Sequence, residues 1–233
     1  APISRSRHTA TLVGRNLLVF GGVGGGRPLN DLFVLHTAGG STHGQFWTEP
    51  PANGVPPTQR VGHASAMVDT KVFFFGGHDG KACLNDVHVL VTMNWRVLNA
   101  KGGRPNPRVG CTLNTVGSKL VLLGGAAQDK AMNDVRVFEL ETGMWTVPTV
   151  SGTPPAALVG HSATLVGTEL FVFGGSDGKN DGNDVHIFDT ETHAWALPSL
   201  EGRAPQARVG HSGTAVSATK IYYYGGYGIR YGY

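Results

Sequence analysis

A glycine-rich loop that follows an apolar run is the first feature of this sequence that could support chemistry. In the stretch LFVFGGSDGKNDGNDVHIF (residues 170–188), two glycines end one apolar run and a polar loop precedes a second one. A loop of this kind could cradle a phosphate if a helix followed it. The stretch lacks the GxxxxGK[ST] signature, however, and no helical periodicity follows it.

The histidines are a second candidate, in this case for a metal site. His63, His161 and His211 share one register, and His8 lies in a similar context. Equivalent positions in neighbouring repeats would lie on a circle, whereas zinc needs ligands about 2 Å away. Cys111 also interrupts the series. We therefore expect a structural role, in which each histidine bonds a nearby turn.

The glycine loop occurs five times in the chain, at intervals of about 50 residues. Its double glycines are Gly21-Gly22, Gly76-Gly77, Gly124-Gly125, Gly174-Gly175 and Gly225-Gly226. An Asn-Asp pair follows four of them, ending in Asp31, Asp86, Asp134 and Asp184, and a tryptophan comes next, at Trp47, Trp95, Trp145 and Trp195. Because a phosphate site occurs once per domain, this repetition favours a structural turn.

A second motif precedes each double glycine. It reads RVGH from Arg60 and Arg208, RVGC from Arg108, LVGH from Leu158, and RH in a shortened form at Arg7-His8. Between the motifs, apolar and polar residues alternate in short runs, which predicts four antiparallel strands in each repeat. One four-stranded sheet cannot bury both of its faces, so neighbouring sheets must stack, and radial stacking gives a β-propeller.

With its double glycines, spaced aromatics and a period of about 50 residues, the chain resembles the kelch-repeat family, and in particular its stand-alone, Rab-effector-like members. The resemblance implies an all-β, kelch-type β-propeller over residues 1–233, with blades at 8–58, 59–106, 107–156, 157–206 and 207–233. Four blades are complete, and the fifth has only its first two strands. We expect the chain to be part of a longer five- or six-bladed ring, or of a five-bladed ring that another chain completes.

The repeated residues are expected to hold this fold together. A Cβ at the double glycine would obstruct the neighbouring backbone. The Asp of each Asn-Asp pair would accept backbone N–H groups in a turn, and the tryptophan would fill the gap between blades near the rim. The repeated arginine would bond loop carbonyls and hold adjacent blades in register.

Catalysis has little support in the sequence. The Ser-His pairs in GHSAT and GHSGT belong to the repeat, and the HExxH, EF-hand and CxxC signatures are missing. Among kelch-like enzymes, the galactose-oxidase type needs a copper site with a cross-linked cysteine, and the nitrile-specifier type needs an ExxxDxxxH iron motif. Cys83 and Cys111 lack a recognisable copper framework, and the iron motif is not found. We predict a protein without a cofactor; the alternative is a metal-dependent kelch-type enzyme.

Residues that differ between repeats are better candidates for binding. A cation recurs in the turn after each double glycine, at Arg27, Lys81, Lys130, Lys179 and Arg230. These cations could form a basic rim that steers an acidic protein segment. They could also be ordinary turn residues, with Asp79, Asp129 and Asp177 weakening their field. The Pro-rich loops between repeats could bind a partner on the opposite face, or only return the chain to the centre.

Composition restricts the remaining possibilities. The net charge of +3 comes from scattered residues, so nucleic acid is not indicated as a partner. No apolar run is long enough to span a membrane, and two unpatterned cysteines suit a reducing compartment. We therefore expect an intracellular, cytoplasmic protein-interaction scaffold or adaptor. The alternative is a structural subunit of a large ciliary or cytoskeletal complex.

Overall fold

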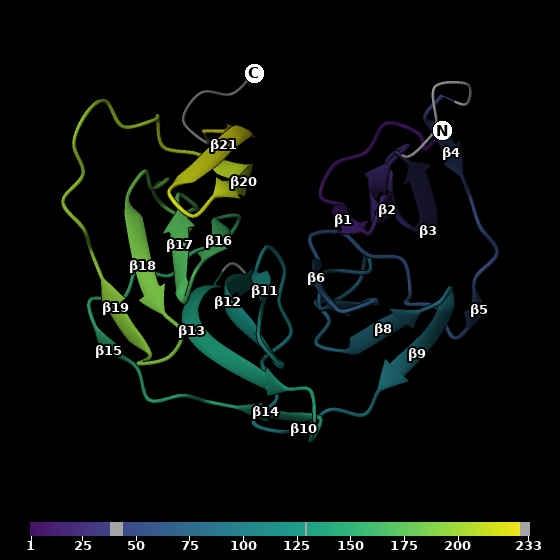
Figure 1. Ribbon diagram of the computed structural model, residues 1–233, viewed down its shortest axis with the longest axis horizontal. Coiled ribbons are helices and arrows are strands. Elements are labelled where there is room, and N and C mark those ends of the chain that lie inside the picture. The colour runs from purple at the N-terminus through teal and green to yellow at the C-terminus, as the bar shows by residue number, and fades with distance from the viewer. Residues whose placement is uncertain (38–43, 129, 229–233) are drawn as a thin grey trace. The chain divides into compact units, whose positions relative to one another are not determined.

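The protein is all-β in its computed structural model, which describes residues 1–37, 44–128 and 130–228 (Figure 1). None of the described residues forms a helix, and the described chain accordingly offers no helical membrane span. The chain divides into two compact units, Ala1–Val109 and Gly110–Tyr233. The all-β class predicted from the repeats is therefore confirmed.

The first unit holds two sheets. One has the order β1-β2-β3-β4 and is formed by β1 (Thr9–Val13), β2 (Asn16–Gly24), β3 (Arg27–His36) and β4 (Phe46–Thr48). The other has the order β5-β9-β8-β7-β6 and is formed by β5 (Asn53–Gly54), β6 (Ala64–Val68), β7 (Lys71–Phe75), β8 (Val87–Val91) and β9 (Asn94–Leu98). β10 (Lys101–Gly102) follows β9 in the chain.

The second unit holds two further sheets and a hairpin. The first sheet contains β11 (Thr112–Val116), β12 (Lys119–Ala127), β13 (Lys130–Glu139) and β14 (Met144–Thr146), in the order β14-β13-β12-β11. The next contains β15 (Ser151–Gly152), β16 (Ser162–Val166), β17 (Glu169–Phe173), β18 (Val185–Asp189) and β19 (Ala194–Ala196), in the order β15-β19-β18-β17-β16. β20 (Val209–Ser217) and β21 (Lys220–Tyr227) form the hairpin.

Each sheet therefore repeats one meander, in which four consecutive strands pair antiparallel with their neighbours. The second strand of each meander is apolar on both faces, because it lies in the middle of its sheet and a neighbouring sheet packs against it. In the first unit, Leu18 and Phe20 of β2 pack with Val72 and Phe74 of β7, and Trp95 closes the same cluster. Within this unit the core thus lies between two successive sheets, as stacked blades require.

An addition to the predicted four strands comes from the loops between blades. The two residues of β5 run parallel to β9, with Asn53 opposite Asn94 and Gly54 opposite Trp95. β15 pairs with β19 in the same way. Gly54 has a φ of 82°, in the left-handed region that favours glycine, and a Cβ at this position would collide with the carbonyl oxygen of Trp95. The Pro-rich loops are therefore partly built into the outer edge of the following blade.

Residues of the repeat and candidate interaction surfaces

The double glycines lie where two consecutive blades meet. Gly21 and Gly174 have φ values of 61° and 64°, and a Cβ on Gly174 would lie 2.7 Å from the carbonyl oxygen of Arg208 and 2.8 Å from Cε1 of His211. The second glycine contacts its own blade instead, since a Cβ on Gly175 would lie 2.9 Å from Cβ of His161. Both glycines are therefore needed for close approach as well as for backbone conformation.

The arginine and aspartate of the repeat bind each other within one blade. The guanidinium of Arg60 donates to both carboxylate oxygens of Asp86, each at 2.8 Å, and to the carbonyl oxygen of Gly76 at 2.9 Å. The Arg60 side chain is fully buried. Burial would raise the pKa of Asp86, but hydrogen bonds from Arg60 and His88 and their charges hold it well below its ordinary value. His88 Nε2 lies 2.8 Å from Asp86 Oδ2.

Two predictions about these residues are wrong. Asp86 was expected to bind backbone N–H groups, but its carboxylate is occupied by side chains. The guanidinium of Arg60 donates to loop carbonyls as predicted, at Thr58 O and Gly76 O, but these partners and Asp86 lie in its own blade or in the segment leading to it. The guanidinium therefore does not hold adjacent blades in register. The backbone of Arg60 makes the contact between blades, because its carbonyl accepts from Gly22 N and its N–H donates to Leu29 O.

The first blade carries the full four-residue motif rather than the shortened one predicted at Arg7-His8. Arg5 donates to both carboxylate oxygens of Asp31, at 2.6 and 2.8 Å, and to Gly21 O at 3.0 Å. Arg5 therefore occupies the place of Arg60. Arg7, with a φ of 55°, adopts the backbone conformation of the glycine in the other motifs. The absence of that glycine from the sequence concealed the motif.

The histidines bind a strand of the preceding blade, not a turn as predicted. His63 Nε2 lies 2.8 Å from Thr9 Oγ1, and His211 Nε2 lies 2.9 Å from Ser162 Oγ. Burial lowers the pKa of His63 from 6.5 to about 3, and the positive charge of Arg60 adds to this effect. Burial also lowers the pKa values of His161 and His211 to about 4. These neutral rings are part of the packing between blades.

Asparagine has a role that the sequence reading missed. Asn85 Nδ2 donates to the carbonyl oxygen of Pro105 at 2.9 Å, and Asn133 and Asn183 bind Pro155 O and Pro205 O at 3.1 and 3.3 Å. Each Asn thus fastens a Pro-rich loop to the blade that precedes it. The sequence contains a signal for this contact, because a proline stands 20 to 22 residues after each of these asparagines.

The tryptophans pack where the blades separate. Trp95, Trp145 and Trp195 are buried, and Trp95 contacts Phe20 and Phe74 with ring centroids 5.0 and 5.1 Å apart. Because Phe20 belongs to the first blade and Trp95 to the second, the indole fills the space between them. Trp47 is only partly buried.

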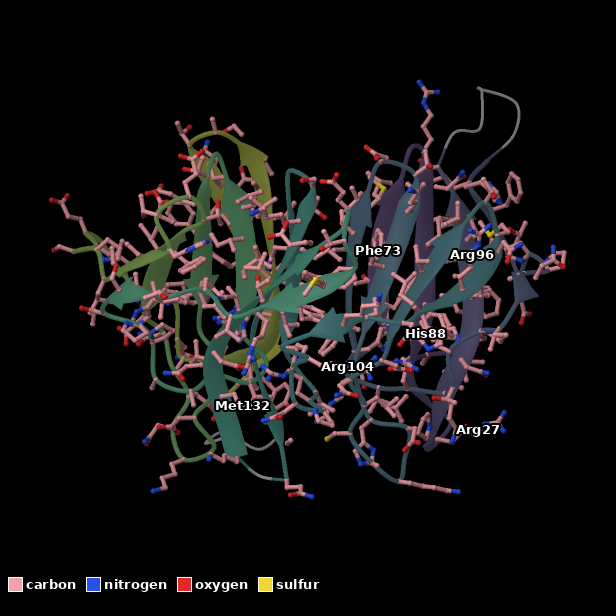
Figure 2. The ribbon with its side chains drawn as sticks, turned by 90° about the horizontal axis from the view of Figure 1, so that it is seen from below. Arg27, Phe73, His88, Arg96, Arg104 and Met132 are labelled. Carbon is pink, nitrogen blue, oxygen red and sulfur yellow. The ribbon has the colours of Figure 1, made fainter. Side chains whose placement is uncertain are left out.

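Four cations of the proposed basic rim lie in the described chain, and all four are exposed. Arg27 begins β3 at the end of the β2–β3 hairpin and points away from the sheet (Figure 2). Lys81, Lys130 and Lys179 are exposed in the equivalent turns, and Arg230 lies outside the described residues. Within the first unit these turns are neighbours, since a Cβ on Gly80 would lie 3.4 Å from Cγ of Pro28.

The acidic neighbours of two of these lysines are engaged by the backbone. Asp79 accepts the N–H groups of Lys81 and Ala82, at 2.7 and 2.8 Å. Asp177 accepts those of Lys179 and Asn180, both at 2.7 Å. These hydrogen bonds lower the pKa of both carboxyl groups. The carboxylates therefore stay ionised and shape the turn, and in the described chain no ion pair joins them to the ammonium groups.

Metal ligands do not converge in the described residues, where no group of three or more His, Cys, Asp or Glu side chains could hold an ion. Cys83 is partly buried and Cys111 is buried, and neither forms a disulfide.

Comparison with known proteins agrees with this architecture. The family described as the KLHDC2/KLHL20/DRC7 Kelch-repeats domain matches residues 1–93 and 89–232. The chain therefore belongs to the kelch-repeat family of β-propeller proteins, as its resemblance predicted.

Several relatives match part of the chain. Acyl-CoA-binding domain-containing protein 5 of Arabidopsis thaliana is 41% identical over 98 residues, which is 40% of this chain and 14% of that protein. A probable serine/threonine-protein kinase of Dictyostelium discoideum is 36% identical over 107 residues, 44% of this chain and 8% of that protein. The Rab9 effector protein with kelch motifs of Rattus norvegicus is 36% identical over 88 residues, 37% of this chain and 23% of that protein. The matches thus span less than a quarter of each relative.

Proposed function

We propose that the chain is a non-catalytic scaffold or adaptor that binds other proteins through the turns after its double glycines. One observation carries this proposal: the described residues of the repeat are largely used in contacts within and between blades, whereas the turns vary and expose cations. Arg60, Asp86 and His63, for example, bind partners inside the fold. Lys81 and Lys179 project from turns that are fixed by Asp79 and Asp177.

The charge of these turns favours an acidic partner segment. Fixed turns present their cations at little entropic cost, because the backbone is already ordered before binding. Exposed charges of one sign increase the association rate more than the affinity, and salt screens them over about 8–10 Å. A Rab9 effector among the relatives supports a protein-binding role in general. We place this role in the cytoplasm, where free thiols remain reduced.

The test is charge reversal with a matched control. A variant with Lys81→Glu, Lys130→Glu and Lys179→Glu is compared with one carrying Lys71→Glu, Lys101→Glu and Lys220→Glu, since all six lysines are exposed. The probe is a fluorescent, glutamate-rich peptide mixed with each protein by stopped flow at several salt concentrations. We expect the turn variant to associate roughly tenfold more slowly at low salt and to lose its salt dependence. Equal slowing in the control variant would show that net charge alone attracts the peptide, and would refute the proposed role of the basic rim.

A further inference from the structure

The fourth blade has a leucine, Leu158, where the motifs of the other blades have an arginine. In the second blade, Arg60 donates to Thr58 O at 3.1 Å and to Gly76 O at 2.9 Å. It also donates to both carboxylate oxygens of Asp86, each at 2.8 Å. Leu158 has no donor and packs against the apolar core of the second unit. The fourth blade therefore keeps the acceptors of this arrangement without its guanidinium.

The equivalent acceptors of the fourth blade are Ala156 O, Gly174 O and the carboxylate of Asp184. Gly174 is buried, and within the described chain its carbonyl oxygen accepts no hydrogen bond. The carboxylate of Asp184 forms no ion pair with any described residue. Because a buried carbonyl without a partner is costly, this pair of acceptors favours a donor from outside the chain.

The same blade also lacks a side chain beside these acceptors. Gly182 precedes the Asn-Asp pair, at a position that other blades fill with a large apolar residue: Leu29, Leu84 and Met132. A Cβ at Gly182 would lie 3.7 Å from Gly174 O and 3.6 Å from Gly175 O. A larger side chain would therefore lie next to these carbonyls, whereas glycine leaves that side uncovered. The internal donor and the neighbouring cover are thus both missing from one blade.

The surroundings of this site are exposed and acidic. Asp184 and Ala156 are both exposed, so a group from solvent can approach the acceptors. Residues 176–184 contain three aspartates and one lysine, which gives this segment a net charge of −2. A segment of this charge attracts a cation.

We propose that the fourth blade binds an arginine side chain of a partner polypeptide, whose guanidinium takes the place that Arg60 has in the second blade. The guanidinium donates to both carboxylate oxygens of Asp184 and to Gly174 O. Its planar fork of donors matches these acceptors, whereas the ammonium of lysine is a point charge. Free arginine would bring an α-carboxylate toward the acidic segment, which peptide-bound arginine does not. This site is separate from the basic rim.

The test compares three probes by amide NMR titration at constant ionic strength: capped Gly-Arg-Gly, capped Gly-Lys-Gly and free arginine. The arginine tripeptide should shift the amide signals of Gly174, Gly175 and Asp184, and should bind about tenfold more tightly than the lysine tripeptide. Free arginine should bind more weakly than the arginine tripeptide. Equal binding of the two tripeptides, or shifts confined to other residues, would overturn the proposal. Tighter binding of free arginine would overturn the polypeptide source.

Protein variants locate the contact. Asp184→Asn should weaken the arginine tripeptide about tenfold, because one carboxylate oxygen of the bidentate pair is lost. Leu158→Arg supplies a guanidinium from within the chain and should abolish binding. The matched control is Glu191→Gln, which removes an exposed carboxylate beyond the other end of β18 and should change nothing. Unchanged binding in Asp184→Asn would refute the site, even if Leu158→Arg did not fold.

A last variant excludes an occupant from the same chain. Arg203 is exposed in the loop that Asn183 fastens through Pro205 O. We expect Arg203→Gln to bind the arginine tripeptide unchanged, and stronger binding would show that Arg203 itself occupies the site, against the proposal. The reversal of Lys81, Lys130 and Lys179 removes cations and should not weaken this tripeptide, so the basic rim and the arginine site can fail separately.

Discussion

The buried histidines between blades should make the second unit sensitive to mild acid. In the unfolded chain a histidine has a pKa near 6.5, whereas burial lowers those of His161 and His211 to about 4. The unfolded state therefore binds more protons between these values, and stability present above pH 6.5 is lost as the pH falls toward 4. In this range, each histidine lowers the free energy of unfolding by about 1.4 kcal/mol per pH unit. Over the roughly 1.5 units from pH 6.5 to pH 5, this amounts to about 2 kcal/mol for each histidine.

Two such histidines predict a loss of about 4 kcal/mol between pH 7 and pH 5. Carboxylates add little in this window, because the lowered pKa values of Asp177 and Asp189 shift their effect to more acidic solutions. Urea unfolding followed by the fluorescence of buried Trp145 and Trp195 would measure the change.

Variants separate the histidine contribution from general acid effects. His161→Gln should reduce the pH-dependent part of the loss by about half, since one of two titrating rings is removed. The control is His193→Gln, which replaces a histidine outside the contacts between blades and should preserve the pH dependence. A loss below about 1 kcal/mol in the unmodified protein, or an unchanged dependence in His161→Gln, would refute the assignment of these low pKa values to burial.

Two stability predictions concern the repeat itself. Gly167 has a φ of 62° and open space around it, so Gly167→Ala should cost about 1 kcal/mol for its backbone alone. Gly174→Ala should cost about 2 kcal/mol more in urea unfolding, because its Cβ would meet Arg208 O; equal losses would show that close approach is unimportant. Leu158 stands where other blades have arginine and Asp184 is exposed, so Leu158→Arg should raise stability by about 1 kcal/mol through a new ion pair. Asp184→Asn in the same chain should remove that gain, and a gain that persisted would point to packing.

The fold was predictable because its signals are local and repeated. Five double glycines, alternating apolar runs and regularly spaced tryptophans each report backbone geometry within one blade, and together they indicated the kelch class that the family match shows. The sequence did not predict that β5 would pair with β9 and β15 with β19 as an extra strand of each blade. Two-residue strands are too short for alternation to develop, so no pattern distinguishes them from a loop.

The partners of the repeated side chains were harder to predict, because those contacts join residues distant in sequence. Arg5 binds Asp31 and Arg60 binds Asp86, in both cases across 26 residues. That constant separation is present in the sequence, but residue type alone favours Arg7-His8 over Arg5 as the first copy of the motif. The interaction is defined by the distance between two motifs, which the residue types of one motif do not report.

The same contacts explain why the arginine and the aspartate recur as a pair. In a complete blade, the arginine binds the aspartate that precedes the third strand, and that strand also covers the apolar residue before the double glycine. The Arg60 side chain is fully buried, so loss of Asp86 would leave a buried charge without its partner. The reverse loss is tolerated, because Asp184 is exposed in the blade where Leu158 replaces the arginine. An arginine in this motif therefore requires an aspartate 26 residues later, whereas an aspartate does not require the arginine.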